Sequence, residues 1–208
     1  MFYDQTMDGV FRFGDIVRGF PRSTPVLAGP LLDDCTAPYK IEVQSSCLSV
    51  ILTPCCSIDK GTLSLAPLCQ ILRSFYQDPW HREDLTRVNR KMPAEKSVPP
   101  HAWRDMLQDV MERELDLERD SWAFEDFFVY EQHDLLPEYI LNVRGGDNPR
   151  TRFYMVDFKT AYRIDCAEIK RNQHPVEAKV LQLSRETRAE LREKIAAYFE
   201  RTPAEDQL

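Results

Sequence analysis

The chain has 208 residues, of which 43% are hydrophobic and 29% are charged, and its net charge is −7. This length supports a single domain, or a single domain with an elaborate insertion. The acidic balance argues against a general attraction to nucleic acid, so such contact would need a local basic patch. Apolar runs stay short of the ~18–20 residues of a membrane span, and the first residues lack a signal-peptide pattern. We therefore expect a cytoplasmic protein with reduced thiols and no membrane contact.

The first 72 residues predict several short strands. Gly14-Asp15 supplies a turn before the β-branched pair Ile16-Val17. Alternating or continuous apolar runs predict further strands over residues 39–44, 48–53 and 62–68, with a loop over 21–37. Ile41 and Val43 alternate with polar neighbours, which is typical of a half-buried strand. Strands joined by short turns favour antiparallel pairing in a small barrel or curled sheet.

The rest of the chain predicts helices as well as strands. Residues 73–120 predict a loop followed by an amphipathic helix from about 100 to 118. Residues 121–208 predict strands over 122–131, 139–143 and 151–164, and a final helix over 185–200. Ser184 is the expected N-cap of that helix, and Leu191, Ile195, Tyr198 and Phe199 its buried stripe.

Two segments near the start are Phe13-Gly-Asp-Ile-Val-Arg18 and, after a loop, Ser49-Val-Ile-Leu-Thr-Pro54. Together they resemble the opening of the PemK/MazF-like toxins. The longer stretch that ends Cys55-Cys56-Ser-Ile-Asp-Lys-Gly61 is also similar to bacterial proteins met beside defence or mobile-element genes. The resemblance covers about the first 70 residues. It implies an SH3-like antiparallel β-barrel. With the two helices and the additional strands that the residue patterns predict, the expected fold class is α+β. For a toxin-like endoribonuclease the resemblance implies Arg18 or Arg22, together with Thr53, as catalytic residues.

Four of the six cysteines lie between residues 47 and 69, namely Cys47, Cys55, Cys56 and Cys69. Four thiolates can hold zinc in a tetrahedral site, which would make this a zinc-stabilised binding domain. The spacing contains no Cys-x₂-Cys pair, and cysteine is among the most buried residue types, so a core role is the favoured interpretation. A reactive thiol with a histidine base is a third alternative.

Two charged patterns have both a chemical and a structural interpretation. Asp157 and Lys159 stand two apart on a predicted strand, as in nuclease metal sites, although an exposed ion pair explains them as well. The arginines around the Gly145-Gly146 turn could contact single-stranded nucleic acid, or form a solvated hairpin tip. The structural interpretation is favoured for both patterns.

Aromatic side chains gather over residues 122–130. Trp122, Phe124, Phe127 and Tyr130 are the candidate partner-binding residues, because this many rings exceed what one buried strand face holds. The sequence contains no phosphate loop and no complete catalytic constellation. The leading hypothesis is therefore a non-catalytic interaction module, an accessory subunit of a bacterial defence or regulatory assembly, whose partner is another protein of the same operon. No cofactor is expected, apart from the possible zinc.

Overall fold

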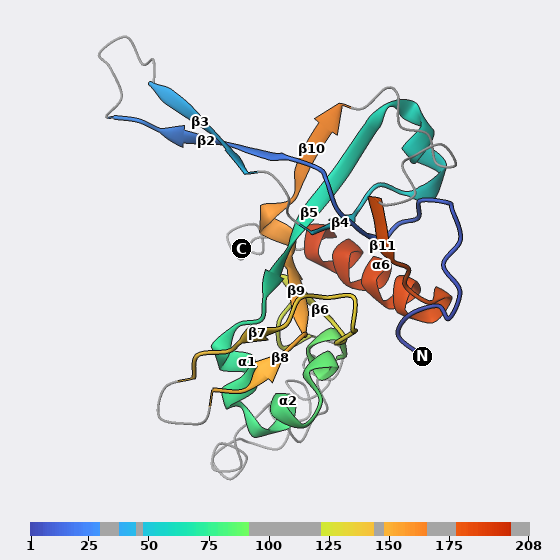
Figure 1. The fold of residues 1–208 in the computed structure, drawn as a ribbon, viewed down its shortest axis with the longest axis vertical. Helices are drawn as coiled ribbons and strands as arrows, with labels where there is room; N and C mark the ends of the chain where they lie inside the picture. Colours follow the sequence, from blue (N-terminus) through green and yellow to red (C-terminus); the bar gives the residue numbers. More distant parts are fainter. Residues whose placement is uncertain (30–37, 45–47, 92–121, 144–147, 166–177, 201–208) are drawn as a thin grey trace, which may run out of the picture. The chain divides into compact units, whose positions relative to one another are not determined.

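The computed structural model describes residues 1–29, 38–44, 48–91, 122–143, 148–165 and 178–200. These residues form a mixed α+β fold with mostly antiparallel strands (Figure 1). The chain divides into two compact units, each made of separated stretches of sequence. Unit 1 comprises residues 1–2, 69–159 and 184–208, and unit 2 comprises residues 3–68 and 160–183. This division differs from the predicted consecutive parts 1–72, 73–120 and 121–208, because residues 160–183 supply strands that pair with strands of the first 72 residues.

Unit 2 is built mainly from five strands. They are β1 (Ile16–Val17), β4 (Ser49–Ile51), β5 (Thr62–Gln70), β10 (Tyr162–Asp165) and β11 (Lys179–Leu181). They pair antiparallel in the order β11-β1-β4-β5-β10 and form an open sheet in the described residues. The strands expected over 48–53 and 62–68 are thus confirmed as β4 and β5.

A short 3₁₀ helix, η1 (Cys55–Lys60), connects β4 and β5. Gly61 ends it with a φ of 78°, a left-handed conformation that glycine adopts without steric cost. Ile58 of η1 is buried and packs into the core of the unit. That core consists of Phe11, Val17, Phe20, Ile51, Ile58, Leu63 and Leu65.

Unit 2 also carries a separate two-stranded hairpin, here called the arm. It consists of β2 (Arg22–Leu27) and β3 (Tyr39–Gln44), which pair antiparallel. The loop predicted over 21–37 is therefore wrong for residues 22–27, because Pro25 lies in an edge strand, where a proline is tolerated. Within the described residues these strands pair only with each other. Figure 1 shows the arm extending away from β4 and β5 of its own unit.

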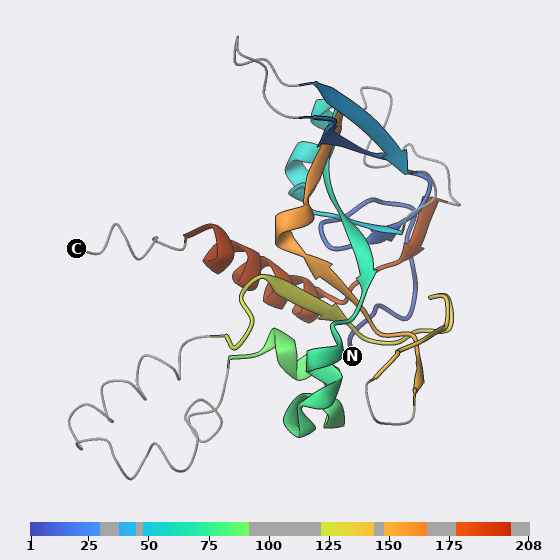
Figure 2. The same ribbon diagram turned by 90° about the vertical axis from the view of Figure 1, so that its left-hand side faces the viewer.

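Unit 1 combines short helices with two strand pairs. Its elements are α1 (Arg73–Gln77), α2 (Pro79–Glu83), η2 (Leu85–Asn89), β6 (Phe127–Tyr130), β7 (Tyr139–Ile140), β8 (Arg150–Thr151), β9 (Tyr154–Asp157) and α6 (Arg185–Glu200). Strand β6 pairs with β9, and β7 with β8. Figure 2 shows α6 running beside β6. The core centres on Phe75, Val88, Val129 and Met155.

Helix α6 confirms the predicted bounds 185–200 and the predicted cap. The Thr187 N–H donates to Ser184 Oγ at 3.2 Å, which satisfies one of the free amides of the first turn. The predicted buried stripe is correct for Leu191, which is fully buried, and wrong for Phe199, which is 70% exposed. Lys194 is fully buried instead.

The long strand predicted over 151–164 is wrong in its continuity. The chain forms β8 and β9, then a 3₁₀ turn η3 (Phe158–Thr160), then β10. The Asp157 side chain accepts a hydrogen bond from the Lys159 N–H at 3.0 Å. Such a local bond competes with the ladder and favours a turn. The helix predicted over about 100–118 lies outside the described residues.

In the described part of the chain, no helix combines the length and apolar character required to cross a membrane.

Candidate functional site

The arm carries five exposed large hydrophobic side chains, more than any other described strand pair. All six residues of β3 are exposed, with Tyr39 at 65%, Ile41 at 69% and Val43 at 66% of their full accessibility. Leu27 on β2 is 51% exposed. The strand predicted over 39–44 is confirmed, but its predicted half-burial is wrong, because within the described residues nothing covers its apolar side.

The register gathers these side chains on one face of the arm. Leu27 stands opposite Tyr39, and Pro25 stands opposite Ile41. Residues directly opposite each other share a face, so these four residues and Val43 form a continuous apolar face. The opposite face is mainly polar and carries the Lys40–Glu42 ion pair, with Nζ and Oε1 2.9 Å apart.

An amphipathic two-stranded ribbon is at most marginally stable alone in water. Its apolar side gains stability only when another surface covers it. Contiguous exposed apolar surface of this kind marks sites of protein–protein contact. The arm is therefore the strongest candidate site in the described residues.

The residues implied by the toxin resemblance all lie in unit 2. Arg18 follows β1 and is exposed, and Arg22 begins β2. Thr53 is 6% exposed, and its hydroxyl accepts a hydrogen bond from the Ser64 N–H at 2.6 Å. Thr53 thus has a structural role at the end of β4, and the catalytic role stays a prediction.

The cysteine cluster is distributed between different environments. Cys55 and Cys56 begin η1, where Cys55 Sγ accepts a hydrogen bond from the Phe13 N–H at 3.4 Å and Cys56 is exposed. Cys69 packs against the core of unit 1. Cys47 lies outside the described residues. Among the residues that the structure describes, no group of three potential metal ligands is present, and the zinc site stays a prediction.

The aromatic residues proposed to bind a partner contribute mostly to the interior of unit 1. Tyr130 is fully buried, which corrects the expectation that its ring is available at the surface. Phe124 and Phe127 pack against Phe75, with ring centroids 4.6 and 5.7 Å away. Trp122 is partly exposed, and its indole N–H donates to the Asn89 carbonyl at 3.0 Å.

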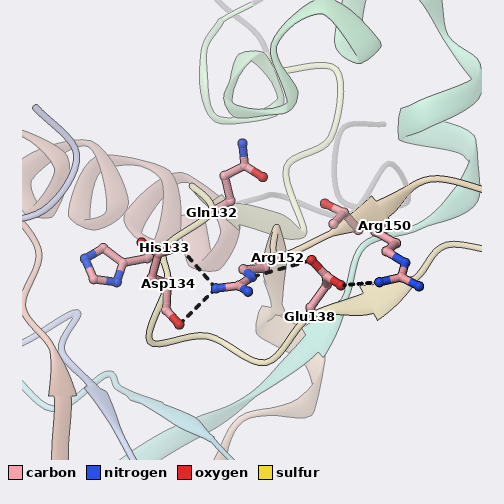
Figure 3. Close-up of a pocket in the computed structure, with 7 residues that line it drawn as sticks. Gln132, His133, Asp134, Glu138, Arg150 and Arg152 are labelled. Atoms are coloured by element: carbon pink, nitrogen blue, oxygen red, sulfur yellow. Dashed lines mark hydrogen bonds and ion pairs between the residues drawn. The ribbon is translucent and has the colours of Figure 1, made fainter.

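Unit 1 contains an open polar pocket of about 500 Å³ next to β8 (Figure 3). Arg152 Nη1 donates to Asp134 Oδ1 at 3.1 Å, and Glu138 lies between Arg152 and Arg150 at 3.9 and 3.4 Å. Gln132, His133 and Thr151 complete the lining. Two carboxylates balance the two guanidinium groups, so the pocket does not form the basic patch that nucleic acid requires.

Among the charged residues considered for metal or nucleic-acid binding, Lys159 forms a local ion pair. Lys159 pairs with Asp126, and hydrogen bonding to that carboxylate raises the pKa of Lys159. The Asp157 side chain accepts a hydrogen bond from the Lys159 backbone N–H. This arrangement supports the structural interpretation of the Asp157–Lys159 pattern. Arg144 lies outside the described residues, and Arg163 belongs to unit 2.

A buried lysine distinguishes helix α6. Lys194 donates through Nζ to the Val88 carbonyl on η2. Burial lowers the pKa of Lys194 to about 7, an effect that the carboxylates of Glu125 and Asp126 partly oppose. His81 is also buried, and desolvation together with nearby Lys194 and Arg87 lowers its pKa against the opposing effect of Asp78.

We expect the stability of unit 1 to rise with pH above about 7 because of Lys194. The folded state binds fewer protons than the unfolded state between the folded pKa of about 7 and the ordinary value of 10.5. The free energy of unfolding then increases through this window by at most about 1.4 kcal/mol per pH unit. Urea unfolding followed by tryptophan fluorescence measures this slope. Lys194→Met should remove the lysine's contribution while filling the same space, and equal slopes for both proteins would contradict the assignment.

Comparison of the chain with family models, curated proteins and solved structures found no match.

Proposed function

We propose that this chain is a non-catalytic interaction module that docks a partner protein through the apolar face of the arm. The observation that carries the proposal is the exposure of Tyr39, Ile41 and Val43 together on one face. A cluster of large apolar side chains with an aromatic member is the composition of an interface core. The polar opposite face keeps the uncovered arm soluble.

The biological setting is part of the same proposal. The chain serves as an accessory subunit of a bacterial defence or regulatory assembly, and its partner is encoded in the same operon. The support is the resemblance of residues 13–18 and 49–54 to the PemK/MazF-like proteins. An SH3-like fold of unit 2 is compatible with the antiparallel pairing of its strands. A cytoplasmic location is compatible with Cys55, Cys56 and Cys69, which form no disulfide among the described residues.

Replacing the apolar face should abolish partner capture. The variant Y39S/I41S/V43S removes three side chains whose burial contributes roughly 1.5–3 kcal/mol each, so partner affinity should fall more than 100-fold. The measurement is co-purification of tagged wild type and variant from cells that express the neighbouring genes, followed by titration of the purified partner.

Val26→Ser is the matched control, because Val26 lies on the opposite face of the same arm and is also exposed. This control should retain the partner at wild-type affinity. A wild-type chain that captures no partner, or a triple variant that binds as tightly as V26S, would contradict the proposed function.

A further inference from the structure

The hydrogen-bonding pattern of the arm determines which backbone groups face its free edges. The Ala28 N–H donates to the Pro38 carbonyl at 2.7 Å, next to the Leu27–Tyr39 pair. Bonded and non-bonded pairs alternate along an antiparallel ladder. The bonded pairs are therefore Val26–Lys40, Thr24–Glu42 and Arg22–Gln44. Consequently Tyr39, Ile41 and Val43 direct their N–H and C=O groups away from β2.

The two edges of the arm differ in their ability to accept another strand. On β2 the residues directed outward are Ser23, Pro25 and Leu27, by the same alternation. Pro25 has no N–H, and a proline on an edge is a common way to prevent strand addition. The outer edge of β3 has no proline within Tyr39–Gln44. Strand addition is therefore possible along β3 and obstructed along β2.

The β3 edge is complementary to itself when two copies run antiparallel about Ile41. In that register Tyr39 stands opposite the second copy's Val43 on the apolar face, an aromatic pair with a β-branched residue. Lys40 stands opposite the second copy's Glu42 on the polar face. Within one chain these two side chains pair with each other at 2.9 Å, and both are exposed, at 66% and 50%, so each can exchange that partner for the oppositely charged residue of the second copy.

The charges also exclude the neighbouring registers. A shift by two residues in one direction places Lys40 opposite the second copy's Lys40. A shift in the other direction places Glu42 opposite the second copy's Glu42. Like charges directly opposite each other are destabilising, so only the register centred on Ile41 pairs opposite charges.

We propose that two copies of the chain pair through their β3 edges, antiparallel and centred on Ile41, into a four-stranded ribbon β2-β3-β3-β2. The inference rests on the proposed function of the arm and identifies its first partner as a second copy. The two apolar faces become one continuous surface across the twofold axis. A protein that contacts both arms then gains affinity from their linkage.

Three backbone-bonded pairs form in this dimer: Tyr39 with Val43, Ile41 with Ile41, and Val43 with Tyr39. Edge pairing of two short strands buries less than the ~1,200 Å² of a standard interface. We therefore expect a reversible dimer whose formation depends on concentration, with dissociation in roughly the micromolar range.

Charge exchange provides the sharpest experiment. Lys40→Glu and Glu42→Lys each place like charges opposite each other in the homodimer, so each variant alone should dimerise at least tenfold more weakly than wild type. An equimolar mixture of the two variants restores opposite charges at both positions and should form a heterodimer. The double variant K40E/E42K should dimerise like wild type. Sedimentation velocity over a concentration series measures all four.

Proline substitution tests the edge itself. Val43→Pro removes an outward N–H from β3 and leaves the β2–β3 bonds intact, so it should abolish the dimer. Ser23→Pro makes the same change on the outer edge of β2 and should leave dimerisation unchanged. Circular dichroism checks that the variants keep their strand content, and the charge-exchange series decides the question if a proline variant does not fold.

A wild-type chain that is monomeric throughout the series, or K40E and E42K variants that dimerise as well alone as when mixed, would overturn the inference. A monomer that still captures a partner in a manner sensitive to Y39S/I41S/V43S overturns the second-copy inference and leaves the proposed function standing. A dimer with the expected charge pattern that captures no other protein supports this inference and contradicts the proposed function.

Discussion

Replacing Lys179 with methionine is expected to lower the free energy of unfolding of unit 2 by about 3–5 kcal/mol. Lys179 Nζ lies 2.9 Å from Asp15 Oδ2 and 3.3 Å from Asp8 Oδ1, and it also donates to Gln182 Oε1 at 2.6 Å and to the Val10 carbonyl at 2.7 Å. The side chains of Lys179 and Asp15 are 1% and 0% exposed. Removing the cation leaves a buried carboxylate without its counter-charge.

The measurement must report on unit 2. Trp80 and Trp122, the two tryptophans in the described part of the chain, belong to unit 1, so their fluorescence does not report directly on unit 2. Hydrogen exchange at buried unit 2 amides, such as the Gly14 N–H bonded to the Ile51 carbonyl, is suitable.

Lys60→Met, at an exposed lysine of unit 2 at the end of η1, is the matched control for Lys179→Met and should change stability by less than about 1 kcal/mol. Asp15→Asn in the Lys179→Met background removes the orphaned charge and should recover part of the loss. Equal stability of the two methionine variants would refute the role assigned to the buried pair.

Replacing Asn89 with alanine should destabilise unit 1 by roughly 2–5 kcal/mol, because it leaves two buried backbone groups unsatisfied. Asn89 is 5% exposed at the end of η2. Its Nδ2 donates to the Val129 carbonyl at 2.7 Å, and its Oδ1 accepts from the Val129 N–H at 2.6 Å. The amide side chain thus replaces a neighbouring strand along β6, on the side opposite Met155.

Tryptophan fluorescence during urea unfolding is the direct measurement for this variant, because Trp122 bonds the Asn89 carbonyl. Asn148→Ala is the matched control. Its side chain accepts a single hydrogen bond from the Val143 N–H at 2.8 Å in an exposed loop. The control should cost about 1 kcal/mol or less. If both alanine variants unfold at the same urea concentration, Asn89 does not support β6 as described.

Residue patterns within a few positions of each other predicted a helix, its cap and several strands. Helix α6 and its Ser184 cap follow from residues within one turn of each other. Strands β3, β4 and β5 follow from alternation or from continuous apolar runs, and Gly61 from the need for a left-handed turn. The sequence did not predict that the strand ends at β9 and a 3₁₀ turn follows. Asp157 is compatible with a strand, and only the hydrogen bond that its side chain accepts from the Lys159 N–H favours the turn.

For the arm, the sequence predicts the strand β3 and its alternating pattern, but it does not predict that the apolar face is exposed. The alternation at Ile41 and Val43 predicted a strand with one apolar face, and the same alternation occurs whether or not that face is covered. The aromatic segment 122–130 posed the opposite problem. The number of rings predicts that some lie at the surface. In the structure, Phe124 and Phe127 pack against Phe75 of α1, in a core that also includes residues of η2.

The sequence by itself determined the bounds of β3 and α6, the cap at Ser184 and the alternation of apolar and polar residues along β3, because each depends on residues only a few positions apart. Only the tertiary structure decided that Lys194 is buried, that Asp15 meets Lys179, and that the apolar face of the arm is exposed. Burial and ion pairing depend on segments distant in the sequence, and the periodicity of one segment carries no information about which other segment covers it.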